Sequence, residues 1–121
     1  MKKILLISQC VFLSVAPAAA DDLSAADALA IMERAKSGSF SARAEAHALT
    51  FYLQGVVEGA AAYQQSLQAR GETTLFCPPR GKGYSMQDVL DLLEKAPPGE
   101  RDAAAPRVIL EGFSRRFPCS D

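Results

Sequence analysis

The side chains able to do chemistry in this 121-residue chain are few and do not form a catalytic set. The single histidine, His47, falls inside a predicted helix, and a general base needs an orienting partner that the sequence does not supply. Glu58 and Glu111 have the chemistry of a glycosidase pair, but nothing in the chain predicts a cleft between them. We therefore expect no catalytic residue and do not expect an enzyme.

Glycines and positive charge around Arg80 and Lys82 superficially suggest a phosphate-binding loop. The segment lacks the order Gly-Lys-Ser/Thr, and no predicted strand precedes it, so it does not fit that motif. The cysteines and the histidine also lack the spacing of a metal site. We expect neither a cofactor nor a metal ion.

Residues 1–20 are typical of a secretory signal peptide, with two lysines, a 12-residue apolar stretch over 4–15, and small residues at 18–20. The apolar stretch is too short to cross a bilayer, which needs about 20 residues. We therefore predict cleavage before Asp21 and a periplasmic protein of residues 21–121 that does not stay in the membrane.

Cleavage would remove Cys10 and leave two cysteines, Cys77 and Cys119. An even number of cysteines in an oxidising compartment predicts a disulfide. Closing this loop would stabilise the fold by about 4 kcal/mol at most. The alternative, a catalytic thiol, is disfavoured because a periplasmic thiol with a free partner tends to be oxidised.

The charge and length of the processed chain narrow its class. Without the signal peptide, 11 basic and 14 acidic side chains remain, a net charge of −3. Mild acidity without a basic run argues against nucleic acid and anionic membranes as partners. The length suits a single domain.

Hydrophobic periodicity predicts four helices and no strand, hence an all-α, four-helix domain closed by one disulfide. Each predicted helix is bounded by capping residues, glycine or proline. The first two predicted helices span 22–36 and 41–69, the latter with Ser41 as N-cap. The third begins with a Ser85–Asp88 capping box and is terminated by the prolines that start at position 97, and the fourth has Asp102 as N-cap and is ended by Pro118.

Gly55 and Gly59 lie four residues apart on one face of the long second helix. Each costs the helix about 1 kcal/mol relative to alanine. A close crossing by another helix would explain that cost, so we expect both glycines to be packing positions. The apolar stripe predicted to face the core contains Leu49, Leu53, Val56, Val57, Ala60, Tyr63 and Leu67.

Four short motifs follow one another between residues 45 and 119. They are the segment Tyr52–Gly59, then Phe76-Cys77-Pro78-Pro79, then Ser85-Met86-Gln87, and finally Phe113 with Phe117-Pro118-Cys119. Their order and spacing resemble the small periplasmic immunity proteins of type VI secretion systems, the Tai-type amidase inhibitors.

This resemblance implies a helical fold, a Cys77–Cys119 disulfide and often a homodimer. It also implies that the protein binds a peptidoglycan-cleaving amidase delivered by neighbouring cells and blocks its active-site groove without catalysis. The chain departs from the family pattern in lacking a second cysteine pair, since Met32 and the region 49–50 occupy those places.

Inhibitors of this kind gain affinity from a rigid protruding element that enters a cleft. The predicted loops 78–84 and 97–102 are the candidates, and tyrosine and arginine are the residue types that most often dominate interfaces. The candidate partner-binding residues are Arg80, Lys82 and Tyr84 on the first loop and Glu100, Arg101 and Asp102 on the second.

Two other functions are weighed against inhibition. A periplasmic acid-stress chaperone would be a dimer that dissociates at acid pH and then binds many clients. The acidic residues that could drive this are spread along the chain and not clustered. A small hydrolase would need a nucleophile and a base that the sequence lacks.

Overall fold

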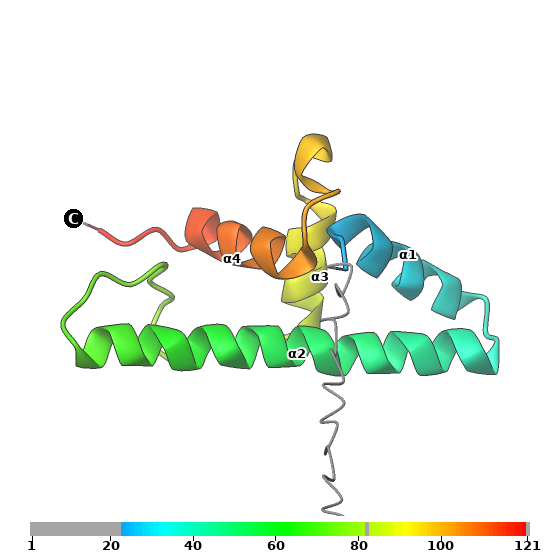
Figure 1. The fold of residues 1–121 in the computed structure, drawn as a ribbon, viewed down its shortest axis with the longest axis horizontal. Coiled ribbons are helices and arrows are strands. Elements are labelled where there is room, and N and C mark those ends of the chain that lie inside the picture. Colours follow the sequence, from blue (N-terminus) through cyan, green and yellow to red (C-terminus); the bar gives the residue numbers. More distant parts are fainter. Residues whose placement is uncertain (1–22, 82, 121) are drawn as a thin grey trace, which may run out of the picture.

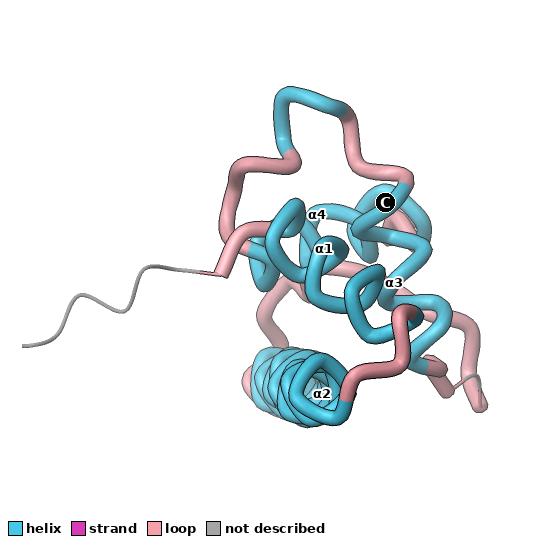
Figure 2. The backbone as a smooth tube through the Cα atoms, turned by 90° about the vertical axis from the view of Figure 1, so that its right-hand side faces the viewer, coloured by secondary structure: helices cyan, strands magenta, loops and turns pink. Residues whose placement is uncertain are grey.

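The computed structural model describes residues 23–81 and 83–120 and contains four α-helices within them (Figure 1). The long helix α2 lies along one side, and α1, α3 and α4 pack against it (Figure 2). The predicted all-α, four-helix fold is confirmed, while the predicted signal peptide lies outside the described residues. The elements are α1 (Ala25–Lys36), α2 (Phe40–Ala69), α3 (Met86–Glu94), the 3-10 turn η1 (Pro98–Glu100) and α4 (Ala105–Arg116).

Serine side chains begin the first three helices. Ser24, Ser39 and Ser85 each accept a hydrogen bond from the backbone N–H three residues further on. Asp88 completes the capping box at Ser85, which confirms that prediction. The predicted cap Ser41 is wrong, because Ser39 already has the extended backbone that a cap needs and Ser41 lies in the first turn of α2.

The start of α4 depends on the chain that precedes α1. Asp102 was expected to cap α4, and this is wrong, because α4 has no side-chain cap. Instead the N–H of Ala105 donates to the carbonyl of Leu23 at 2.7 Å, and the N–H of Ala25 donates to the carbonyl of Ala103 at 3.0 Å. A backbone carbonyl from the N-terminal end of the domain therefore accepts the hydrogen bond that a capping side chain usually accepts at a helix start.

The core lies between α2 and the three shorter helices. Phe76, from the loop after α2, stacks on Phe113 of α4 with ring centroids 5.3 Å apart. Gly112 allows α4 to approach α3, since a Cβ there would lie 3.0 Å from Cδ2 of Leu92. The largest fully buried side chains are Leu53, Val89, Leu93, Val108, Ile109 and Phe113.

Only one face of α2 is covered by the rest of the described chain. A Cβ at Gly55 or Gly59 would meet no atom within 4 Å, so the predicted crossing by another helix is not found among the described residues. Tyr63 was expected in the core but is 53% exposed, and Gln64 is buried in its place. Near the C-terminal end of α2, the residue that faces the core is therefore one position later in the sequence than predicted.

Candidate functional site

The side chains first considered for catalysis lie on two helices, α2 and α4, where each has its own local contact. His47 is exposed on α2, where its ring packs edge-on against Phe51 at 4.8 Å. Gln54 donates to the carboxylate of Glu58, and Glu111 pairs with Arg107 at 2.8 Å, so each glutamate bonds to its own helix. Within the described part of the chain, no group of ligating side chains could hold a metal ion, and no helix has the length and apolarity to cross a bilayer.

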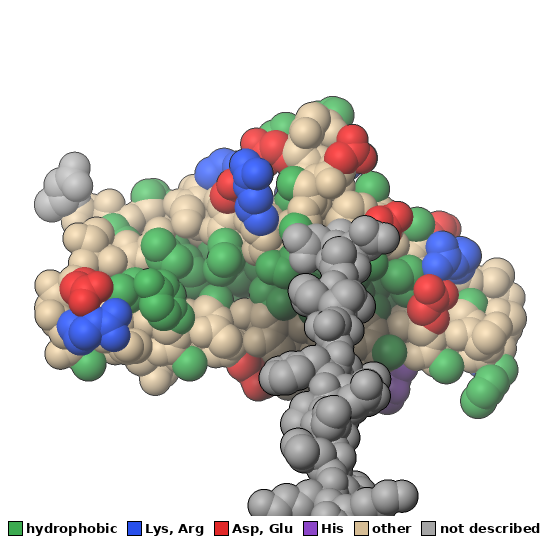
Figure 3. All heavy atoms as spheres, viewed as in Figure 1, with side chains coloured by type: hydrophobic (Ala, Val, Ile, Leu, Met, Phe, Trp, Pro, Cys, Tyr) green, Lys and Arg blue, Asp and Glu red, His purple; other side chains and the backbone are tan. Residues whose placement is uncertain are grey.

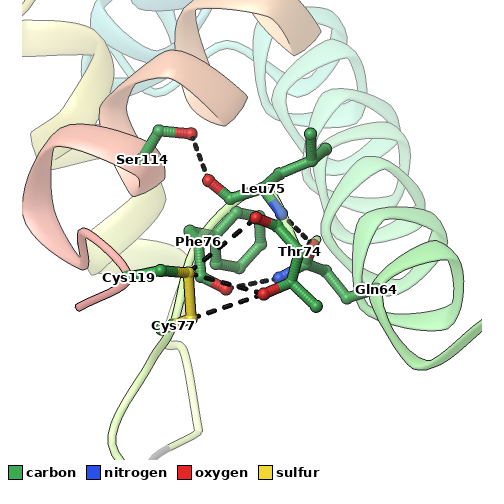
Figure 4. The surroundings of a disulfide bond; sticks show 7 residues. All are labelled: Gln64, Thr74, Leu75, Phe76, Cys77, Ser114 and Cys119. Atoms are coloured by element: carbon green, nitrogen blue, oxygen red, sulfur yellow. Dashed lines mark hydrogen bonds between the residues drawn. A yellow bond between two sulfur atoms is a disulfide. The ribbon is translucent and has the colours of Figure 1, made fainter. Parts of the chain in front are cut away.

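The predicted disulfide is present and joins two distant segments (Figure 4). Cys77 follows α2 and Cys119 follows α4, with an S–S distance of 2.03 Å. The hydroxyl of Thr74 lies 3.4 Å from each sulfur. The end of the domain is therefore tied covalently to the base of the loop that begins at Pro78.

Gln64 holds the same segment from the opposite side (Figure 4). Its Oε1 accepts from the N–H of Leu75 at 2.6 Å, and its Nε2 donates to the carbonyl of Phe76 at 2.5 Å. Gln64 is 6% exposed and is the one buried polar side chain among residues 23–81 and 83–120. The sequence analysis missed it, because the apolar stripe predicted its neighbour Tyr63 to face the core instead.

The C-terminal end of α4 supplies the remaining partners. The hydroxyl of Ser114 donates a hydrogen bond to the carbonyl of Leu75 at 3.1 Å, and the N–H of Cys77 donates to the carbonyl of Phe117 at 2.7 Å. Residues 75–77 therefore lie between α2 and the end of α4 with polar groups bonded on both sides. This arrangement fixes the base of loop 78–83.

The structure divides the predicted residues of the first loop. Arg80 is exposed, and Lys82 lies outside the described residues. Tyr84 instead faces inward, with its ring centroid 4.5 Å from that of Phe113 and 5.8 Å from that of Phe117. The ring of Tyr84 therefore packs against the end of α4, and its predicted role as a partner contact stays a prediction.

The tyrosine hydroxyl at position 84 is buried and has no hydrogen-bond partner among the described residues. Burial raises the pKa of Tyr84 above its usual value of 10.0, and the nearby Arg116 partly offsets the rise. The phenol is thus held in its neutral form.

The second predicted loop forms a protrusion, here residues 97–103, that stands clear of the helices (Figures 1 and 2). The guanidinium of Arg101 donates to the carbonyls of Glu94 and Ala96, at 2.7 and 3.2 Å, at the end of α3. Glu100 forms an ion pair with Arg115 at 3.2 Å. Both side chains therefore anchor the protrusion, while Asp102 is exposed.

The two loops do not form one site. Figure 2 places the protrusion and loop 78–83 on opposite sides of the helices. A single cleft in a partner can therefore receive one of them, and the predicted set of six residues divides into two surfaces.

Replacing the tyrosine, Tyr84→Phe, removes a buried hydroxyl without a partner, so we expect stability at pH 7 to change by less than about 1 kcal/mol. Because the folded-state pKa is raised, the folded protein keeps a proton that the unfolded chain loses above pH 10.0, and stability falls as pH rises. Urea unfolding of the variant between pH 8 and 11 should show a smaller fall in stability with rising pH than that of the wild type. An unchanged decline would contradict the assignment.

Removing the buried amide, Gln64→Leu, leaves the N–H of Leu75 and the carbonyl of Phe76 unpaired, so we expect a loss of about 2–4 kcal/mol in the free energy of unfolding. The control Gln65→Leu alters the exposed neighbour and should change stability by less than about 0.5 kcal/mol. Urea unfolding measures both. Equal effects of the two substitutions would show that Gln64 does not hold the loop.

The chain was compared with known protein families, curated proteins and solved structures. The family model of the Rap1a immunity proteins matches residues 7–119, which is nearly the whole sequence. Neither the curated proteins nor the solved structures give a match. The match spans the disulfide, the protrusion and all four helices, and the chain belongs to the Rap1a immunity protein family.

Proposed function

We propose that this is a periplasmic, non-catalytic immunity protein that binds and inhibits a peptidoglycan amidase effector of a type VI secretion system. Family membership supports an immunity function, and the expected signal peptide supports the compartment. The amidase comes from the Tai-type resemblance of residues 45–119. Association of two copies, which that resemblance also implies, is part of the proposal.

The protrusion is the observation that carries inhibition. Its first two residues are prolines, whose rings fix the backbone φ angle. Within it, the N–H of Glu100 donates to the carbonyl of Pro97 at 2.8 Å and the N–H of Ala103 to that of Glu100 at 3.0 Å. A segment already ordered before binding loses little conformational entropy when it enters a cleft.

The base of the protrusion is held from the N-terminal side as well. The N–H of Ala26 donates to the carbonyl of Arg101 at 2.9 Å, beside the Ala25–Ala103 bond. Together with the Arg101 and Glu100 contacts, these bonds leave the tip, Pro97 to Gly99, as the free part. The tip is exposed and uncharged, which suits insertion into a groove shaped for a peptide chain.

The alternative of an acid-stress chaperone gains no support from the contacts. Glu33, Glu45 and Glu111 each pair with a separate basic side chain, at 2.5, 3.0 and 2.8 Å. Exposed pairs of this kind contribute little individually, and the three glutamates do not form one acidic cluster. Inhibition therefore stays the better-supported function.

A long side chain at the tip, Gly99→Arg, should block insertion. A Cβ at Gly99 meets no atom within 4 Å, so we expect stability to change by less than about 0.5 kcal/mol. Binding to the amidase encoded beside this gene should weaken by roughly 100-fold, about 2.7 kcal/mol, and hydrolysis should return. Calorimetry and a peptidoglycan hydrolysis assay measure both effects.

The matched control is Gly83→Arg, which adds the same side chain to an equally open position on the other loop. It should leave binding unchanged. If instead Gly83→Arg abolished amidase binding and Gly99→Arg bound like the wild type, the contact would be assigned to loop 78–83. No binding by the wild-type protein would overturn the amidase assignment.

A further inference from the structure

The disulfide exposes its two cysteines unequally to solvent. Cys77 is exposed, whereas Cys119, beyond the end of α4, is half-buried. Exposed disulfides are the ones that external thiols open most readily, because a thiolate must reach a sulfur before it can attack it. The protein therefore carries a sulfur–sulfur bond that a thiol outside the protein can approach from the side of Cys77.

Access decides which sulfur receives the new bond. An incoming thiolate bonds to one sulfur of a disulfide while the other sulfur leaves. Attack on the sulfur of Cys77 forms a mixed disulfide there and breaks the bond to Cys119. The electron pair of the broken bond stays on the sulfur of Cys119, which then takes a proton from water. One disulfide has been exchanged for another, so no further oxidant or reductant is needed.

The hydroxyl of Thr74 is placed to help the leaving sulfur. Its Oγ1 lies 3.4 Å from the sulfur of Cys119 and equally far from that of Cys77 (Figure 4). A hydroxyl that donates a hydrogen bond to a thiolate stabilises the charged form, and a stabilised thiolate leaves faster. Because Thr74 is equally close to both sulfurs, it helps the reaction without selecting between them, and the difference in exposure makes the selection.

The charges beside the disulfide do not repel an anionic thiolate. Arg70 and Glu72, which precede it in the chain, pair with each other at 2.6 Å. Figure 3 shows acidic and basic side chains next to each other at the C-terminal end of α2, with mostly uncharged surface around them. Arg80 adds an exposed positive charge three residues after Cys77. These charges therefore favour the approach of a negatively charged group.

The two cysteines stay side by side when the bond between them opens. The N–H of Cys77 donates to the carbonyl of Phe117 at 2.7 Å, and Gln64 and Ser114 bond to the two residues before Cys77. None of these hydrogen bonds involves a sulfur. The released thiol of Cys119 is thus kept at a high effective concentration beside the mixed disulfide, where it can attack Cys77 and close the original bond.

We propose that Cys77 is a site of reversible thiol–disulfide exchange in the folded protein, at which an external thiol becomes covalently attached while Cys119 is released. The attached group stands at the base of loop 78–83. Small thiols and protein dithiols share the required chemistry. The inference does not depend on the amidase or on the association of two copies, so a failure of the proposed function leaves it intact.

Trapping the exchange in the wild-type protein is the main test. Reduced glutathione is added to the folded protein near neutral pH, the reaction is stopped with N-ethylmaleimide, and peptide mass spectrometry locates both groups. We expect early samples to carry glutathione on Cys77 and maleimide on Cys119, in at least roughly threefold excess over the opposite arrangement. Equal or reversed labelling, or a bond that stays closed in the folded protein, would overturn the proposal.

Two single-cysteine variants measure access directly. Cys119→Ser keeps the thiol of Cys77, and Cys77→Ser keeps that of Cys119, so the variants lack the same disulfide and are matched. With oxidised glutathione, Cys119→Ser should form a mixed disulfide at least roughly tenfold faster than Cys77→Ser. Equal rates in folded variants, judged by circular dichroism, would overturn the assignment to Cys77. Should either variant unfold, the wild-type trapping decides alone.

The role of the hydroxyl is tested by two substitutions at one position. Thr74→Val removes the hydroxyl and keeps the branched shape, and it should slow opening of the disulfide by glutathione roughly threefold or more. Thr74→Ser keeps the hydroxyl and should open at close to the wild-type rate. Equal rates for the two variants would overturn the part assigned to Thr74.

A last measurement asks whether exchange occurs without unfolding and which thiol it favours. The helical circular dichroism signal should persist during opening, because the hydrogen bonds around Cys77 do not need the disulfide. A thioredoxin is the second probe beside glutathione. At equal thiolate concentration, the faster reagent shows whether a protein dithiol or a small thiol is the preferred source. Loss of the helical signal together with opening would overturn the proposal, because exchange would then require unfolding.

Discussion

The amide of Gln64 is the interaction on which the C-terminal half of the domain depends. Phe76 can stack on Phe113 only if the loop backbone beside it runs close under α4. That backbone carries polar groups into a poorly hydrated place, where unpaired donors and acceptors are costly. Gln64 pairs two of them, and the end of α4 pairs others. The disulfide then makes the same connection covalent.

The sequence predicted the parts of the fold that local rules determine. The capping box at Ser85, the glycine after α2 and the pairing of Cys77 with Cys119 need only neighbouring residues or a count of cysteines. Local rules failed where a distant segment takes over. Asp102 has the chemistry of a helix cap, yet the carbonyl of Leu23 reaches the first N–H of α4 instead. No pattern within either segment reveals that contact.

The candidate site was predictable as loops and not as side chains. Proline and glycine mark both loops, but they do not show which arginine points outward. Arg101 folds back onto two carbonyls at the end of α3, whereas Arg80 stays exposed. The glycine pair on α2 shows the same limit, because its cost to the helix indicates a close approach without showing from which side. Only the three-dimensional structure shows that this side is open to solvent.

The way the protrusion is anchored has a consequence for how such a protein can evolve. Its hydrogen bonds and ion pair involve Glu100, Arg101 and Ala103, which join it to α1, α3 and α4. Gly99 at the tip is exposed, and a Cβ there would meet no atom within 4 Å. Substitutions there are therefore nearly free of a stability penalty, while each one changes the outermost surface. Under the proposed function, a lineage can follow a changing effector through substitutions at the tip while the scaffold stays constant.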